Sequence, residues 1–126
     1  MKTIAVIAAI ALLAAPAGYA FGAEPGQATK TDKGRVLTDQ KGMTLYIFDK
    51  DKGGKPSCNG ACLAVWPPLM ATNVDHAHAG WKRVSRDNGS EQWAYKGRPV
   101  YTYALDSKPG DIKGDGVEGT WHLARP

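Results

Sequence analysis

The residues with the clearest potential for metal chemistry are two histidines near the middle of the chain. His76 and His78 lie two positions apart, so their imidazoles point the same way on a strand or converge from a loop. Neutral imidazole is a good ligand for copper and zinc, and Met70 is close in sequence. One interpretation is a copper or zinc site formed by His76, His78 and Met70. The alternative is a polar loop that binds no metal, and no other cofactor is predicted.

Two cysteines offer a second kind of chemistry. Cys58 and Cys62 are four positions apart. The N-terminal region, described below, predicts an exported protein, and an even cysteine count in such a protein indicates a disulfide. A regular helix holds such Cβ atoms about 5–6 Å apart, whereas a disulfide needs roughly 3.5–4.5 Å. The bridge therefore requires a distorted turn, which Asn59 and Gly60 can supply. A redox-active pair, or a thiolate metal site with the nearby histidines, remains an alternative to a structural disulfide.

A third group of residues occurs twice. Each copy contains a tyrosine, a second aromatic residue, an aspartate and a tryptophan, and the copies are 55 positions apart. The first copy is Tyr46, Phe48, Asp51 and Trp66; the second is Tyr101, Tyr103, Asp106 and Trp121. Rare residue types at one fixed offset indicate an internal duplication. We expect both aspartates to cap turns and both tryptophans to lie at the centre of a shared core.

The elements that position these residues are predicted to be mostly strands. The aromatic runs that precede Asp51 and Asp106 are rich in β-formers, and glycines at turn positions come before them. A short helical stretch is expected over 58–65, capped by Ser57 and ended at Trp66 by the prolines that follow. The predicted fold is a small antiparallel β domain over 35–126. Its repeat units span about 35–70 and 90–124, and neither is large enough to fold alone.

The N-terminal region predicts export. Lys2 precedes an uninterrupted apolar stretch, and small residues follow Pro16, as in a signal peptide over 1–20. We expect cleavage after Ala20, with Ala17 as the alternative, and a flexible tail over 21–34. No cysteine lies near this junction to carry a lipid. The expected mature protein is therefore periplasmic or secreted, with no stable membrane insertion.

Composition and motifs narrow the function further. The 126 residues carry a net charge of +4 with the two signs interleaved, which argues against a nucleic-acid partner. None of the common hydrolase, metalloprotease or nucleotide-binding motifs is present. The acidic loops that contain Asp51 and Asp111 lack the EF-hand pattern, so they are expected to be solvated turns rather than calcium sites.

The duplicated units resemble a known family. Together with the Cys58 to Leu69 segment and the loop at Pro109, they are similar to the bacterial secreted repeat family of predicted lipoproteins with the Yx(FWY)xxD motif. The resemblance covers about 35–124. It implies an exported protein and no established catalytic residues. Many relatives carry a lipid-attachment cysteine after the signal, and this chain departs from that pattern.

These observations favour a non-enzymatic envelope module that binds a small ligand or an envelope partner, or that serves a structural role. Two alternatives from other classes remain. One is a periplasmic copper or zinc protein that uses His76 and His78, and the other is a redox protein that uses Cys58 and Cys62.

Overall fold

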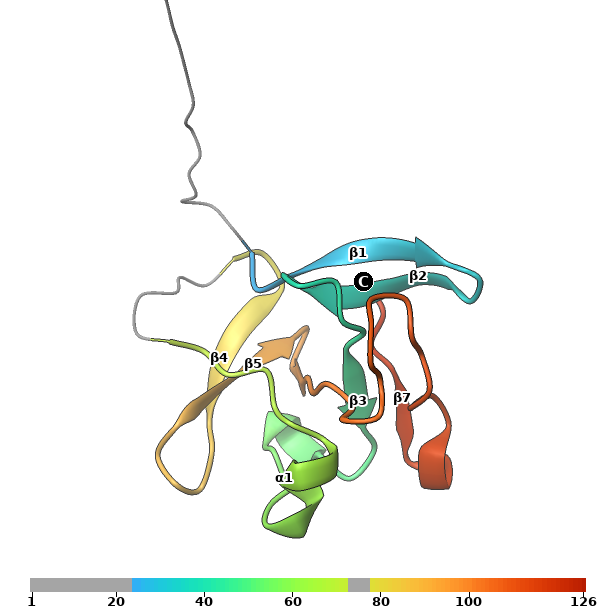
Figure 1. The fold of residues 1–126 in the computed structure, drawn as a ribbon. Helices are drawn as coiled ribbons and strands as arrows, with labels where there is room; N and C mark the ends of the chain where they lie inside the picture. The colour runs from blue at the N-terminus through green and yellow to red at the C-terminus, as the bar shows by residue number, and fades with distance from the viewer. Residues whose placement is uncertain (1–23, 73–77) are drawn as a thin grey trace, which may run out of the picture.

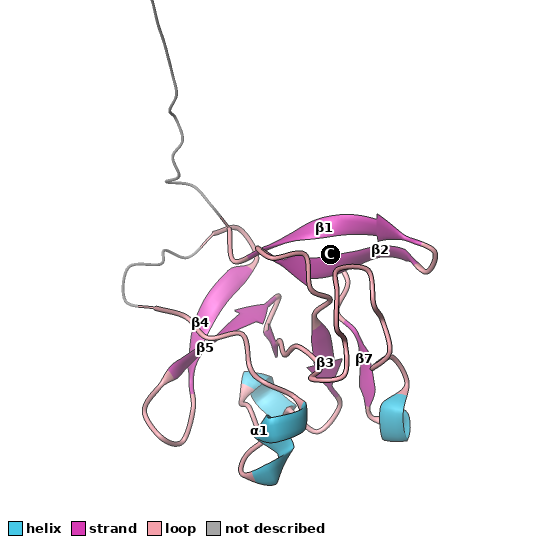
Figure 2. Ribbon diagram, in the orientation of Figure 1, coloured by secondary structure: helices cyan, strands magenta, loops and turns pink. Residues whose placement is uncertain are grey.

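The structure is a computed structural model that describes residues 24–72 and 78–126. The predicted signal peptide over 1–20 lies outside these residues. Among them the chain forms short strands, one short α-helix and two single 3₁₀ turns (Figures 1 and 2). The elements are β1 (Gly26–Thr31), β2 (Gly34–Asp39), β3 (Tyr46–Phe48), α1 (Ala61–Val65), β4 (Trp81–Ser85), β5 (Glu91–Tyr95), β6 (Arg98–Pro99) and β7 (Trp121–Leu123), with 3₁₀ turns at Lys52–Gly54 and Val117–Gly119.

The strands form three small antiparallel sheets. β1 pairs with β2, β3 pairs with β7, and β5 lies between β4 and β6. Figure 1 shows the β1–β2 hairpin and the β4–β5 hairpin at separate edges of the molecule, with β3 and β7 side by side. The prediction of a mostly β, antiparallel fold built from two repeat units is confirmed.

The two halves are joined by reciprocal backbone hydrogen bonds. The Tyr46 amide donates to the Tyr101 carbonyl at 2.8 Å, and the Tyr101 amide donates back to Tyr46 at 3.0 Å. The Leu69 amide donates to Val100, and its counterpart 55 positions later, Ala124, donates to Leu45. Each of these hydrogen bonds therefore has an equivalent in which the donor and acceptor halves are exchanged. This pattern indicates a local two-fold relation between the halves. Because β3 and β7 come from different halves, the β3–β7 sheet requires both halves, whereas the β1–β2 and β4–β5–β6 sheets each lie within one half.

Two clusters of buried side chains form the core. The first contains the duplicated tyrosines and two of the tryptophans, and the second contains the other two tryptophans. The buried members of the first are Val36, Tyr46, Cys58, Trp66, Tyr101, Trp121 and Leu123, and those of the second are Leu37, Leu45, Trp81, Trp93, Val100 and Ala124. The expected central position of Trp66 and Trp121 agrees with this arrangement.

The predicted flexible tail over 21–34 is wrong in its described part. The chain there forms β1, which pairs with β2 from Gly26 opposite Asp39 to Thr31 opposite Gly34. Gly26 packs so closely that a Cβ there would lie 2.5 Å from the Thr38 carbonyl oxygen. The polar composition of β1 suggested a tail. Pairing with a buried neighbour, rather than a strong apolar pattern of its own, makes it a strand.

The helical prediction is correct in type but not in detail. α1 begins at Ala61, and its N-cap is Gly60 with φ 62°, not Ser57. The Ser57 hydroxyl instead donates to Asp51 Oδ1 at 2.8 Å. Because an aspartate of the duplicated set accepts from Ser57, this serine fixes the loop before the helix rather than the helix itself.

Candidate functional site

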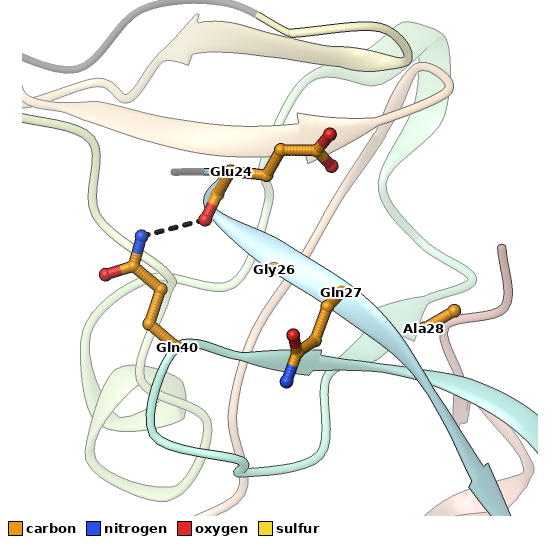
Figure 3. A pocket seen from close by; sticks show the side chains of 5 residues that line it. All are labelled: Glu24, Gly26, Gln27, Ala28 and Gln40. Atoms are coloured by element: carbon orange, nitrogen blue, oxygen red, sulfur yellow. Dashed lines mark hydrogen bonds between the residues drawn. The ribbon is translucent and has the colours of Figure 1, made fainter. Parts of the chain in front are cut away.

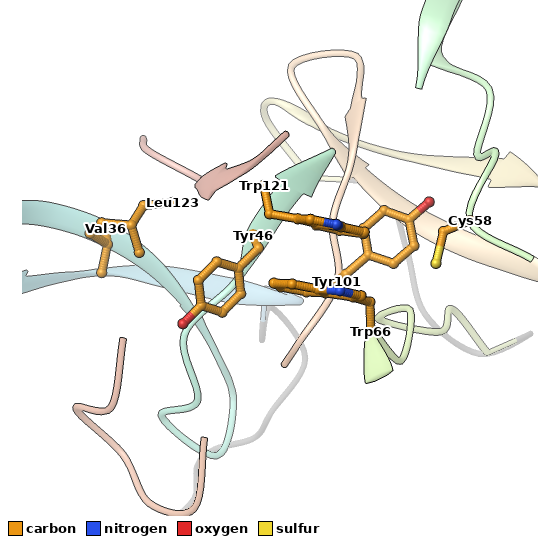
Figure 4. Close-up of a cluster of buried hydrophobic side chains, with 7 residues drawn as sticks. All are labelled: Val36, Tyr46, Cys58, Trp66, Tyr101, Trp121 and Leu123. Atoms are coloured by element: carbon orange, nitrogen blue, oxygen red, sulfur yellow. The ribbon is translucent and has the colours of Figure 1, made fainter. Parts of the chain in front are cut away.

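The duplicated aromatic residues meet between the two halves. The Trp66 and Trp121 rings stack with centroids 3.8 Å apart and planes 2° apart (Figure 4). Phe48 stacks on the other face of Trp121, and Tyr103 on the other face of Trp66, each at 4.2 Å. The stack runs Phe48, Trp121, Trp66, Tyr103, so each outer ring rests on the tryptophan of the opposite half.

The tyrosine hydroxyls also bond to the opposite half. Tyr46 donates to Asp106 Oδ2 at 2.6 Å, and Tyr101 donates to Asp51 Oδ2 at 2.8 Å. Both tyrosines are fully buried and both aspartates are 7% exposed. A hydrogen bond from a hydroxyl to a buried carboxylate is among the stronger kinds in proteins. The two bonds therefore link the halves at equivalent points.

The second oxygen of each aspartate holds the turn that follows it. Asp51 Oδ1 accepts from the Ser57 amide at 2.7 Å, and Asp106 Oδ1 accepts from the Lys113 amide at 2.9 Å. Turn capping therefore agrees with the prediction from sequence. The link to the other half's tyrosine was not predicted. Each aspartate consequently fixes one loop and one inter-half contact.

Burial raises the pKa of both tyrosines well above the ordinary value, and the adjacent aspartate raises it further. The hydroxyls therefore remain protonated throughout the physiological range and act as donors. A permanently protonated, buried phenol cannot serve as a base toward a dissolved substrate. The arrangement therefore suits a scaffold better than a reaction centre.

This geometry predicts a loss of stability at alkaline pH. Because the folded pKa values of Tyr46 and Tyr101 lie above 10.0, the unfolded chain releases these protons first. Their contribution is complete below pH 10.0 and falls above it, by up to about 1.4 kcal/mol per pH unit for each tyrosine. Urea unfolding between pH 9 and 12 measures this slope. Tyr46→Phe should remove about half of the tyrosine-dependent slope, and an unchanged slope would contradict the assignment.

A buried arginine, missed by sequence analysis, supports the loop that contains the cysteines. Arg86 is 5% exposed, and its guanidinium donates to the Cys58 carbonyl and, at 2.7 Å, to Asn59 Oδ1. It also donates to Gln92, whose amide nitrogen donates to the Val100 carbonyl. The residue 55 positions before Arg86 is Thr31, so the repeat pattern gave no sign of this role.

The two cysteines form a disulfide with a Cα–Cα distance of 5.4 Å. Cys58 is 1% exposed and belongs to the first core cluster, against which Cys62 packs. A sulfur enclosed in a core has little access to a redox partner. These surroundings favour the structural interpretation of the bridge.

Removal of the disulfide should therefore be costly but tolerated. The short loop gives an entropic contribution of about 2 kcal/mol, and we expect Cys58→Ser/Cys62→Ser to lose about that amount of unfolding free energy. Urea unfolding measures the free energy of unfolding of the variant and of the reduced wild-type protein, each relative to the disulfide-bonded wild-type protein. If the variant and the reduced protein each lost less than about 0.5 kcal/mol, a structural role would be contradicted.

The predicted metal site is only partly covered by the structure. His76 lies within 73–77, outside the described residues, whereas Met70 is 43% exposed. No group of three or more His, Cys, Asp or Glu side chains suited to a metal occurs within 24–72 and 78–126. His122, on β7, forms a 2.8 Å contact with Asp49 across the β3–β7 edge. The copper or zinc site at His76, His78 and Met70 stays a prediction.

A polar pocket of about 460 Å³ lies along β1 (Figure 3). It is lined by Glu24, Gln27 and Gln40, together with Gly26 and Ala28, and Gln40 donates to the Glu24 carbonyl at 2.8 Å. Ligand pockets are mostly apolar with a few convergent polar groups. The lining of this one contains no large apolar side chain and offers little to hold a ligand.

The fold and core define a class of protein built from two interlocked β repeats. Residues 27–70 and 82–125 match the model of a family described as a secreted repeat of unknown function. The chain belongs to this family. The matches begin at 27 and 82 rather than at the predicted 35 and 90, which adds β1 and β4 to the repeats.

No curated protein and no solved structure matches the chain. Within the described ranges, none of the helices has the length and apolar character needed to cross a bilayer.

Proposed function

We propose that this exported protein is a non-enzymatic binding module of the cell envelope, in which the duplicated motif is the scaffold rather than the site. One observation carries the proposal: the first tyrosine of each motif copy, Tyr46 or Tyr101, donates to the aspartate of the opposite half inside the core. The hydroxyls and carboxylates that would otherwise do chemistry are occupied in joining the halves. Ligand recognition then falls to the surface.

The compartment we propose is the periplasm. The signal-like N-terminus, the family's secreted character and the disulfide support a protein that works outside the cytoplasm. A small domain gains stability from such a bridge, since its hydrophobic core is limited in size. The module binds a small ligand or an envelope partner through side chains on its loops and strand edges.

Cell fractionation and chemical nitration test the two parts of this proposal. The full-length chain, expressed in a bacterium with two membranes, should yield a cleaved product in the periplasmic fraction. In the purified native protein, tetranitromethane should spare Tyr46 and Tyr101 and modify the half-buried Tyr95, with all three reacting after unfolding. Retention in the cytoplasm would overturn the compartment. Rapid native nitration of Tyr46 or Tyr101 would overturn the scaffold role.

A further inference from the structure

A groove on the surface lies apart from the stacked aromatic core. It has a volume of about 280 Å³ and is bordered by the β5–β6 turn, β3 and the chain after β7. Its apolar lining includes Ile47, Val100 and Leu123, together with the half-buried Tyr95 ring. An apolar floor of this kind is what ligand pockets commonly present to the non-polar part of a small molecule.

The charged residues that line the groove are all cationic: Lys96, Arg98 and Arg125. The Lys96 ammonium lies 5.4 Å from the centroid of the Tyr95 ring. Arg125 is held in place because its guanidinium donates to the carbonyls of Lys33 and Arg35, at 2.8 and 3.1 Å. The groove therefore combines an apolar surface with a concentrated positive charge, which is complementary to an anion.

Arg98 and Lys96 have no acidic partner within the described part of the chain. None of the ion pairs and side-chain hydrogen bonds found there involves the Arg98 guanidinium or the Lys96 ammonium. Lys96 also has φ 49°, in the left-handed region that lysine rarely occupies, within a two-residue turn completed by Gly97. These cations therefore have capacity left for a ligand.

The internal duplication offers a comparison for the same positions. Counting back 55 residues, Arg98 corresponds to Met43 and Arg125 corresponds to Met70. An uncharged side chain thus serves at both positions in the first half, so the repeat fold itself does not require a cation there. The positive charge at these two positions is found in the second half alone, whereas Lys96 corresponds to Lys41. For Arg98, which has no ion-pair partner among the described residues, this favours a role in binding over a role in folding.

We propose that this groove binds a small amphiphile with one anionic head and one apolar body. The proposal rests on the proposed function and names the ligand class of the binding module. The head pairs with Arg98, Lys96 and Arg125, and the body lies against Ile47 and the Tyr95 ring, the partly exposed apolar side chains of the lining. A volume of about 280 Å³ is at the small end of ligand sites, which suits a single short chain or ring rather than a two-chain lipid.

Three probes with the same alkyl chain test the head-group preference. Decanoate and decyltrimethylammonium are titrated into the purified protein below their micelle concentrations, and decanol is titrated up to its solubility limit. Amide shifts are followed by NMR. We expect saturable decanoate binding with Kd of about 1 mM or tighter, and at least about tenfold weaker binding of the other two. Decyl phosphate should bind like decanoate, because the shared feature is the anionic head.

Variants locate the site. Arg98→Met installs the residue of the first half, and it should weaken decanoate binding about tenfold or more while leaving decanol binding unchanged. The control is Lys41→Met, which removes one positive charge from the first-half turn equivalent to Lys96 and Gly97. It should change the affinity for neither decanoate nor decanol. Thermal melts check that both variants remain folded.

The outcomes separate this inference from the one on which it rests. Three results would overturn the groove assignment and leave the scaffold role standing. They are no decanoate binding, equal binding of all three head groups, and equal effects of Arg98→Met and Lys41→Met. Conversion of decanoate to another compound, detected by mass spectrometry, would overturn the non-enzymatic function and the groove assignment together.

Discussion

Replacement of Trp66 by alanine is expected to lower the free energy of unfolding by about 3–5 kcal/mol. The Trp66 ring is 4% exposed and lies between Trp121 and Tyr103, so its removal leaves Tyr103 and one face of Trp121 without a stacking partner. Because the cavity would sit between the two halves, loss of packing there should weaken the whole fold rather than one loop. Trp121→Ala should cost a similar amount, since Trp121 lies between Trp66 and Phe48.

Thermal and urea unfolding measure this effect. For a domain of about 100 residues, a loss of 3 kcal/mol corresponds to a fall in Tm of roughly 12 °C or more. Leu105→Ala is a suitable control because that side chain is 64% exposed, and its replacement should change stability by less than about 0.5 kcal/mol. Shifts of only one or two degrees for the tryptophan variants would mean that the stack contributes little to the core.

An internal repeat in the sequence predicts which residues are equivalent, but not which residues are partners. A fixed offset identifies equivalent residues, and burial follows from residue type, so the central place of Trp66 and Trp121 was predictable. The offset does not reveal which half supplies a residue's partner. Tyr46 could bond to Asp51 or to Asp106 with the same pattern in the sequence, and only the three-dimensional arrangement selects Asp106.

Other features were missed because their cause is tertiary. β1 carries no strong apolar alternation, and its strand conformation depends on β2. Arg86 becomes a structural residue because the chain brings it to the Cys58 carbonyl, 28 positions away in sequence. The cationic groove collects Arg98 and Arg125 from separate segments of the second half. In each case the local sequence is compatible with several environments, and packing decides among them.

The exchange of partners between the halves gives the second large prediction. Removal of the Asp106 carboxylate leaves the buried Tyr46 hydroxyl without an acceptor, which costs about 1–3 kcal/mol. It also removes the carboxylate that accepts from the Lys113 amide and holds the following turn. We therefore expect Asp106→Ala to lose about 3 kcal/mol of unfolding free energy. The equivalent variant, Asp51→Ala, should lose at least as much, because Asp51 accepts from Tyr101 and from both the amide and the hydroxyl of Ser57.

Double-mutant cycles distinguish exchange between halves from contacts within a half. Tyr46→Phe combined with Asp106→Asn should give a coupling energy of about 1–3 kcal/mol, and Tyr101→Phe with Asp51→Asn should behave alike. The matched controls pair each tyrosine with its own half's aspartate, and their coupling should stay below about 0.5 kcal/mol. If the controls coupled more strongly than the exchanged pairs, each half would be holding its own tyrosine, and the interlocked core would be wrong. Strong coupling only in the exchanged pairs would instead mean that one repeat cannot satisfy its own buried carboxylate, which is a physical reason for the two repeats to occur in one chain.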